Sequence, residues 1–228
     1  MARKQGATAA GVSGGEQEES GPAPAPVGAS LSTLRAAAQK CHACPLWRRA
    51  TQTVFGAGRA HAALLLVGEQ PGDQEDREGL PFVGPAGRLL SEAMEAAGID
   101  RQAVYLTNAV KHFKWVAAEG RGKRRIHQKP SGNEVRACRP WLLAEIEAVA
   151  PAVIVCLGAT AARSLLGNAF RVTQQRGQLV ASPLAARVVA TVHPSSILRA
   201  PDQESRRQEL RRFIADLRVA RDLAAARH

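Results

Sequence analysis

The sequence lacks any uninterrupted apolar run of about 18 residues, which is roughly the length that a membrane-spanning helix needs. The N-terminus also lacks the basic-then-apolar order of a secretory signal peptide. We therefore expect a soluble protein with a cytoplasmic location. Aromatic residues are scarce, at 4% of the 228 residues, although hydrophobic residues of all kinds reach 45%. That length suits one globular domain with a tail.

Acidic residues are in the minority, because 31 Lys and Arg stand against 20 Asp and Glu, which gives a formal charge of +11. A net positive field favours polyanions over acidic proteins or anionic small molecules, so nucleic acid is the first partner we expect. The alternative is a basic composition spread over a solvated surface. The distribution argues against it, since residues 111–129 hold seven Lys or Arg and one Glu, a net +6. Glycine and proline residues in and after this segment predict a loop.

Residues 1–30 are predicted to form a disordered tail, because they contain six Gly and three Pro and almost nothing large enough to bury. The tail ends where Leu31, Leu34 and Ala38 take up a helical spacing, with Ser30 or Ser32 able to cap the first turn. We therefore expect one folded domain over residues 31–228.

Four short apolar runs predict strands that are buried on both faces, at residues 63–67, 104–107, 153–157 and 188–192. Helical patterns lie between them at 87–97, 134–149 and 159–166, and an amphipathic helix over 202–225 closes the chain. This alternation predicts a three-layer α/β/α fold with a central four-stranded, mainly parallel sheet. Ligands bind beyond the carboxyl ends of such strands, so the residues that follow each strand are the candidates for a site.

The chain has four cysteines, Cys41, Cys44, Cys138 and Cys156. Two disulfides are disfavoured in a cytosolic chain, and the spacing of Cys41 and Cys44 suits two thiolates on one metal centre. Tetrahedral zinc and an iron-sulfur cluster both take four thiolates, so the count leaves both open. The wide separation of the last two cysteines favours a cluster, because structural zinc sites usually pair two short hairpin-like couples. For Cys156 the alternative is a small apolar residue in a strand.

The segment after the first predicted strand, residues 68–76, is a glycine-rich turn that carries acids. It has neither a Gly-Lys-Ser/Thr string nor a GxGxxG pattern, so a nucleoside triphosphate or dinucleotide site is disfavoured. Acid-base or electrostatic chemistry on a buried group is favoured instead. Asn108 follows the second strand, with His127 further along, and His193 follows the fourth. A capping or packing role is the alternative for each of these side chains.

Several strings together carry a resemblance to a known family: GEQPGDQED, the following PFVGPAGRLL, the segments TNAVKH and HPSSILR, and the cysteine spacing. From about residue 34 to the C-terminal helix the chain resembles the uracil-DNA glycosylase superfamily, specifically its iron-sulfur family 4 branch. Gln70 and the insertion KRRIH at residues 123–127 are typical of the UdgX group within that branch.

The resemblance implies an enzyme that flips uracil out of DNA, preferably single-stranded DNA, and cleaves its N-glycosidic bond. Phe82 would stack on the flipped base, Asn108 would bond the uracil edge, and His193 would donate to a uracil carbonyl. Gln70 is expected to brace the loop or turn, and Asp73 to fix the loop through Arg or backbone contacts. The expected DNA-binding residues are Lys123, Arg124, Arg125 and Ser195. By the same resemblance a 4Fe-4S cluster is held by Cys41, Cys44, Cys138 and Cys156, and we expect a monomer.

In the UdgX group the histidine of the KRRIH string attacks the sugar, and by resemblance this residue is His127, with Glu69 orienting it or accepting its proton. A neutral alkylated imidazole is a poor leaving group, so the protein is expected to react once and remain attached to C1′. The alternative for His127 is a phosphate contact. Two rival functions stay open: an ordinary multiple-turnover family 4 glycosylase, in which Glu69 or Gln70 positions water, and a non-catalytic, zinc-containing single-strand binding module.

Overall fold

The computed structural model describes residues 25–118, 125–182, 184 and 187–226. Residues 1–24 of the expected tail, and the expected DNA-binding residues Lys123 and Arg124, lie outside this part. Ala25 and Ala29 pack against a hydrophobic cluster. The packed chain therefore begins earlier than residue 31, where the sequence places the start of the domain.

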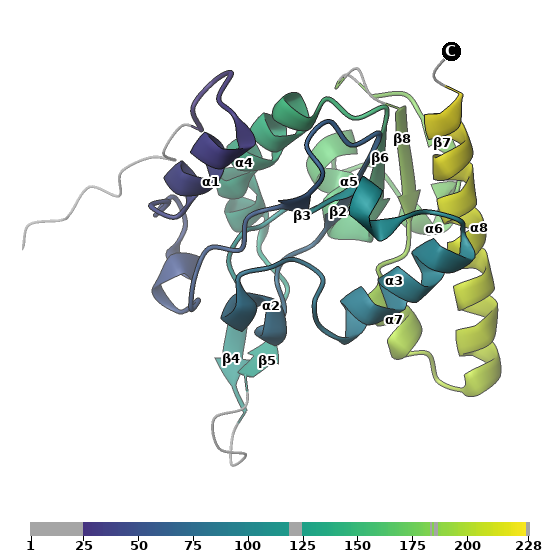
Figure 1. Cartoon of the computed structure of the whole chain (residues 1–228). Coiled ribbons are helices and arrows are strands. Elements are labelled where there is room, and N and C mark those ends of the chain that lie inside the picture. Colours follow the sequence, from purple (N-terminus) through teal and green to yellow (C-terminus); the bar gives the residue numbers. More distant parts are fainter. Residues whose placement is uncertain (1–24, 119–124, 183, 185–186, 227–228) are drawn as a thin grey trace, which may run out of the picture.

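Six strands of the described chain form one sheet in the order β1-β3-β2-β6-β8-β7 (Figure 1). The four central strands are parallel: β3 (Tyr105–Asn108), β2 (Leu64–Gly68), β6 (Val153–Leu157) and β8 (Arg187–Thr191). They match the four predicted runs, so the predicted central sheet is confirmed. The short edge strands β1 (Ala57–Gly58) and β7 (Leu179–Val180) pair antiparallel and were not predicted, because two residues leave no periodic pattern.

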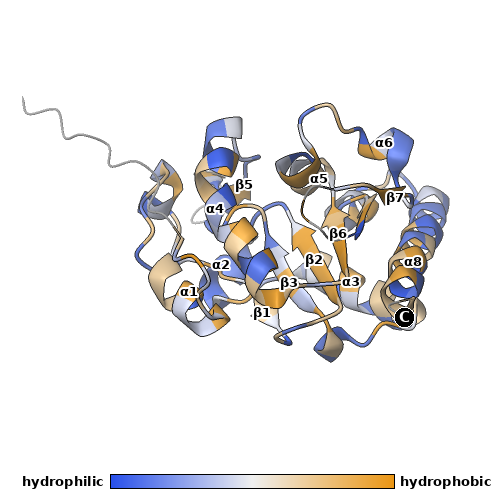
Figure 2. Ribbon diagram, turned by 90° about the horizontal axis from the view of Figure 1, so that it is seen from above, coloured by the Kyte–Doolittle hydropathy of each residue, from blue (hydrophilic) through white to orange (hydrophobic). Residues whose placement is uncertain are grey.

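Helices cover both faces of the sheet, which confirms the three-layer arrangement (Figure 1). One face packs against α3 (Pro85–Ala96), α7 (Pro194–Leu198) and α8 (Gln203–Ala225), and the other against α4 (Gly132–Val149), α5 (Ala159–Leu166) and α6 (Val172–Gln175). Along β6, Val153 and Val155 belong to the first core and Ile154 and Cys156 to the second. This alternation explains why the strand is an unbroken apolar run, and Figure 2 shows β2 and β6 as hydrophobic.

The first helix, α1 (Leu31–Ala38), begins as the spacing predicted, and Ser30 is its cap because its hydroxyl accepts from the Thr33 N–H at 3.3 Å. The helix packs on α4 around a third cluster that includes Trp141. Two 3₁₀ turns, Pro45–Arg48 and Arg101–Ala103, complete the connections. None of the helices in the described ranges is both long and apolar enough to cross a membrane.

Two segments differ from the prediction. Part of the acidic turn after β2 is a helix, α2 (Asp73–Glu78), whose first turn carries three acids that favour the positive end of the helix dipole. The predicted loop over residues 111–129 contains an antiparallel hairpin of β4 (Trp115–Ala117) and β5 (Arg125–His127). The hairpin is held by contacts with α2 and with Gln70, which are described below. These residues are distant in sequence, so the local sequence pattern could not predict the hairpin.

Candidate active site

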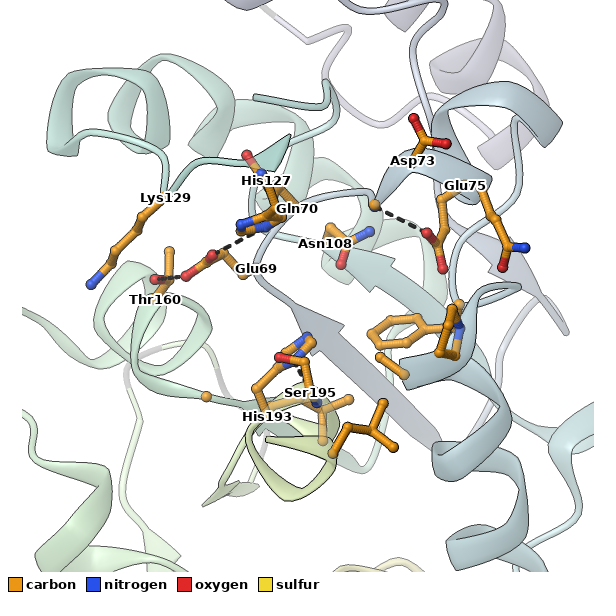
Figure 3. Close-up of a pocket in the computed structure, with 18 of the residues that line it drawn as sticks. Glu69, Gln70, Asp73, Glu75, Asn108, His127, Lys129, Thr160, His193 and Ser195 are labelled. Atoms are coloured by element: carbon orange, nitrogen blue, oxygen red, sulfur yellow. Dashed lines mark hydrogen bonds and ion pairs between the residues drawn. The ribbon is translucent and has the colours of Figure 1, made fainter. Parts of the chain in front are cut away.

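A cavity of about 840 Å³ lies at the carboxyl ends of β2 and β6 (Figure 3). These neighbouring strands continue toward opposite edges of the sheet, and a crevice forms where the strand order reverses in this way. The cavity is lined by eight of the residues that the sequence placed in the site: Glu69, Gln70, Asp73, Phe82, Asn108, His127, His193 and Ser195. The fold therefore brings every expected catalytic and substrate-binding side chain to one place.

The floor of the cavity depends on Gly68, the last residue of β2. A Cβ at this position would overlap with Asn108 Oδ1 and would lie 2.6 Å from Phe82 Cζ. Asn108 and Phe82 are 3% and 6% exposed. A glycine at the strand end therefore allows an amide and an aromatic ring to meet over the backbone, which suits recognition of a flat polar ligand.

Phe82 has a left-handed backbone with φ of 58°, which is unusual for an aromatic residue. Arg101 donates a hydrogen bond of 3.0 Å to its carbonyl oxygen, and a Cβ on Gly87 would overlap with the same oxygen. The Phe82 ring lies 6.4 Å from the ring of His193, with 28° between their planes. Its neighbours thus hold the ring in one orientation, facing the histidine.

His193 caps α7 and is the buried imidazole of the site. The Ser195 backbone N–H donates to its Nδ1 at 3.2 Å, and the Ser195 hydroxyl lies 2.8 Å from the same atom. A backbone N–H only donates, so Nδ1 is unprotonated and the neutral ring carries its proton on Nε2. Burial, with smaller contributions from nearby His127 and Arg199, lowers the pKa of His193 to about 4. His193 is therefore a neutral N–H donor at physiological pH.

His127 lies across the cavity, on β5, beside Glu69. Its Nε2 is 3.7 Å from Glu69 Oε1, and the other carboxylate oxygen of Glu69 accepts a hydrogen bond from Thr160 (Figure 3). Burial lowers the pKa of His127, although Glu69 raises it, and Arg199 adds to the lowering. The half-exposed imidazole is therefore mainly neutral at pH 7, which leaves a free lone pair on the ring. Sequence reasoning missed Thr160. It stands three residues after β6, so inspecting the residues that follow each strand would have found it.

The sequence of this chain matches a known family. A family model described as the uracil DNA glycosylase superfamily matches residues 55–218. The chain belongs to the uracil-DNA glycosylase superfamily. A protein of Thermotoga maritima named Type-4 uracil-DNA glycosylase is 38% identical over 179 residues, which cover 78% of this chain and 85% of the relative.

Two further relatives place the chain within the superfamily. A Type-4 uracil-DNA glycosylase of Sulfurisphaera tokodaii is 33% identical over 181 residues, covering 76% of this chain and 78% of the relative. A Type-5 uracil-DNA glycosylase of Pyrobaculum aerophilum is 32% identical over 102 residues, covering 44% of this chain and 40% of the relative. The Type-4 likeness thus extends over a larger share of the chain.

In this superfamily member the hairpin that carries His127 is braced by Gln70. The Gln70 amide donates to the carbonyl oxygens of Lys114 at 3.2 Å and Gln128 at 3.0 Å, and it accepts from the Lys114 N–H at 3.3 Å. Lys114 precedes β4 and Gln128 follows β5, so one side chain holds both chain segments at the base of the hairpin. Gln70 itself follows Glu69, directly after β2. This contact is the bracing role that the sequence suggested for Gln70.

Arg125 anchors the same hairpin from its other side. Its guanidinium forms ion pairs with Asp73 and Asp76 of α2 and lies 5.2 Å from the ring centroid of Phe113. Its side chain is 11% exposed. The charge of Arg125 is thus paired inside the protein, and the expectation that Arg125 binds DNA stays a prediction. Asp73 lines the cavity, but its carboxylate is engaged with Arg125 and Arg77.

Other cations of residues 111–129 are also paired internally. Lys111 pairs with Glu145 in the core, and Lys114 pairs with Glu134 at 2.9 Å. Lys129 is exposed at the edge of the cavity. The basic stretch is thus partly a set of internal anchors, which a count of charges along the sequence does not distinguish from a binding surface.

Three of the four cysteines lie together beside α1 and α4. The Sγ of Cys41 accepts from Trp141 Nε1 at 3.2 Å, and the Sγ of Cys138 accepts from the Lys111 N–H at the same distance. The pKa of Cys138 is raised to about 12, mainly by burial; Lys111 opposes this rise, and nearby Cys44 and Cys41 add to it. These thiols share one packed cluster, but within the described residues no three His, Cys, Asp or Glu side chains are arranged to hold a metal ion.

Cys156 is apart from these three thiols. It lies on β6 in the core between the sheet and α5, whereas Cys41 and Cys138 belong to the cluster beneath α1. Burial alone raises its pKa to about 12, without a contribution from another cysteine. The expectation that Cys156 is a fourth ligand is therefore wrong, and the alternative, a small apolar residue in a strand, is correct.

His112 is a buried nitrogen donor that sequence reasoning did not consider. It directly follows Lys111, is 4% exposed, and has its Nε2 at 2.9 Å from the hydroxyl of Thr53, which in turn donates to the carbonyl of Ala38. Burial lowers its pKa to about 4, with Asp76 raising it and His42 lowering it. The available signal was its place in the TNAVKH segment, which contributed to the family resemblance but was not considered as a ligand. Three thiols and one neutral imidazole fit an iron-sulfur cluster, which accepts both ligand types.

We expect Arg125→Gln to loosen the hairpin, because it removes both ion pairs with α2. Hydrogen bonds to charged groups contribute about 1.5–3 kcal/mol each, so amide hydrogens of β4 and β5 should exchange with solvent at least about tenfold faster. Hydrogen-exchange mass spectrometry measures this rate. Arg77→Gln is the matched control, because Arg77 contacts the same Asp73 from an exposed position and forms no ion pair with the described residues of β4 and β5. Unchanged exchange in Arg125→Gln would contradict the anchoring role.

Proposed function

We propose that this protein excises uracil from DNA and remains covalently attached to the resulting abasic site through His127, as in the UdgX group. The observation that carries the proposal is the position of His127, a neutral imidazole in the same cavity as Asn108, Phe82 and His193. Membership of the superfamily and the Type-4 relatives support the glycosylase reaction. Covalent capture rests on His127 and its surroundings. We place the reaction in the cytoplasm and assign it to a monomer.

Recognition of the base is assigned to Asn108 and Phe82. An amide offers both a donor and an acceptor, which match the ring N–H and carbonyl oxygen of uracil and mismatch the edge of cytosine. Phe82 provides a fixed ring against which a flipped base stacks. Flipping a base costs least in a single strand, so single-stranded DNA is the preferred substrate in this proposal.

His193 stabilises the leaving base. As the bond between C1′ and N1 breaks, its electron pair moves onto uracil, and negative charge develops on the carbonyl oxygen. The Nε2–H of neutral His193 donates to that oxygen, from a ring that Ser195 holds in place. Loss of a preorganised donor of this kind typically costs about 10²–10³ in rate.

His127 then supplies the bond that replaces the broken one. The lone pair of a ring nitrogen attacks C1′, and the other nitrogen releases its proton to Glu69 or to water. The Glu69 carboxylate, fixed by Thr160, also stabilises the positive charge that develops on the sugar. The product is a neutral alkylated imidazole, which leaves poorly, so the reaction stops after one turnover.

Denaturing electrophoresis of the protein with a single-stranded oligonucleotide that contains one uracil tests covalent capture. We expect a band that contains both protein and DNA with uracil and none with thymine, and we expect His127→Ala to lose it. His42→Ala is the control, because His42 is outside the cavity. An ordinary family 4 glycosylase would instead give free abasic DNA that hot alkali cleaves, without the band. Either that result, or a band that persists in His127→Ala, would overturn the proposal.

The rate of adduct formation should depend on pH through His127. The deprotonated ring is the nucleophile, and the pKa of His127 is below its ordinary value of 6.5, so the rate should be level near pH 7–8 and fall as the pH drops below 6.5. Quenched single-turnover reactions across this range measure the profile. A rate that rises on acidification would contradict attack by a neutral imidazole.

We further propose that Cys41, Cys44, Cys138 and His112 hold a 4Fe-4S cluster. When bound, such a cluster would supply a structural link between the N-terminal segment and α4, and no step of the reaction above passes through it. The resemblance to the iron-sulfur family 4 branch and the packing of Cys41, Cys44 and Cys138 in one cluster support the proposal. His112 is proposed as the fourth ligand because its buried ring directly follows Lys111, whose backbone N–H donates to Cys138.

Iron content and visible absorbance of purified variants test the ligand set. Cys156→Ala should keep both, because Cys156 lies in another core, whereas Cys138→Ala should lose them. His112→Ala should lower the iron content, and His112→Cys should restore it, because thiolate is the commoner ligand. Loss of iron in Cys156→Ala together with full iron in His112→Ala would show that the ligand set is wrong.

A further inference from the structure

A second cavity of about 620 Å³ lies between α4 and α5 and has a strongly basic lining. Its cations are Lys129, Arg136, Arg139 and Arg163, and its described lining includes no acidic residue. The cavity also lies beside the first turn of α4, where the positive end of an 18-residue helix adds to the field. Four cations without a balancing carboxylate indicate an anionic ligand.

The arginines of this cavity are incompletely satisfied by the protein. Within the described residues Arg163 Nε is buried and has no hydrogen-bond partner. Arg139 donates to the carbonyl oxygen of Ser164 at 2.9 Å, and Arg136 contacts the amide oxygen of Asn133. Neither interaction neutralises a charge. A buried donor without a partner is unfavourable, and a phosphate oxygen would satisfy it while pairing the charge.

The second cavity continues from the candidate active site. Lys129 and Thr160 line both cavities, and Thr160 holds Glu69, the residue beside His127. Figure 3 shows Lys129 and Thr160 on the side of the site where Glu69 and His127 lie. A DNA strand whose sugar reaches His127 has further phosphates on either side of that sugar. Because Lys129 lines both cavities, a strand that leaves the active site over Lys129 would bring its next phosphates to Arg136 and Arg163.

We infer that the cavity between α4 and α5 binds a phosphodiester of the DNA strand next to the flipped nucleotide. This inference rests on the proposed function for the location of the uracil. The arginines contact backbone phosphate, so the cavity contributes affinity without reading sequence. From the sequence, phosphate binding was expected of the basic residues in the hairpin. In the structure, Arg125 of the hairpin pairs with two carboxylates of the protein itself.

Binding of a uracil-free, single-stranded oligothymidylate tests the cavity separately from catalysis. We expect Arg136→Gln and Arg163→Gln together to weaken binding by about threefold to tenfold at low salt. The slope of log affinity against log salt should also become shallower by about 0.7 for each phosphate that the variant no longer neutralises. Arg59→Gln is the control, because Arg59 is exposed beside β1 at the opposite, amino edge of the parallel strands. Arg136 is exposed as well, so its single variant keeps the test valid even if the Arg163 change affects folding.

Oligonucleotides with uracil near one end show which flank is bound. Weaker binding by the double variant only when the strand extends on one side of the uracil would support the inference and assign that side. An unchanged affinity and salt slope in the double variant would overturn it, whether or not uracil is excised. If the wild-type protein released no uracil, the proposed function would fail, whereas a reduced slope with oligothymidylate would still support the cavity.

Discussion

The buried pair between Lys111 and Glu145 connects the candidate active site to the rest of the molecule. Their side chains are 2% and 0% exposed, and removal of one partner from such a pair typically costs about 3–5 kcal/mol. Lys111 also donates to the carbonyl oxygen of Asn108 at 2.8 Å, and its backbone N–H donates to Cys138. Glu145 accepts from Tyr105 at 3.0 Å. The end of β3, the helix α4 and the thiol cluster are therefore held by one network, and the position of the recognition amide depends on it.

The charged side chain of Arg125 in the hairpin stabilises its position in the fold. Two carboxylates of α2 hold Arg125, and the amide of Gln70 bonds backbone groups at both ends of the hairpin. His127 stands at the end of β5, so these contacts determine where its ring reaches the cavity. Within the described residues, Lys129, Arg136, Arg139 and Arg163 line the second cavity instead, without an ion pair to a carboxylate. Residues 111–129 are therefore basic in sequence, although several of their charges are paired inside the protein. The unpaired cations described above line the cavity between α4 and α5.

The two imidazoles of the cavity have the same protonation state and different tasks. Burial keeps both His127 and His193 neutral, and Arg199 lowers the pKa of both. Ser195 holds the proton of His193 on Nε2, which makes that ring a donor. His127 faces a carboxylate and keeps a lone pair, which the proposed reaction uses for attack. In that proposal a single electrostatic environment suits both departure of an anionic base and capture of a cationic sugar.

The sequence by itself determined the four central strands and most of the helices that cover them, because strands buried on both faces appear as unbroken apolar runs. It also located Glu69, Asn108 and His193, because parallel strands end at a common edge. Only the tertiary structure showed that Cys156 lies in a different core from Cys41 and Cys138. A strand that is apolar on both faces has no alternation in its sequence, so the sequence does not show to which face a given side chain points. Only the tertiary structure showed that Arg125 pairs with α2 and that the His112 ring contacts Thr53, because both facts depend on contacts between segments far apart in the chain.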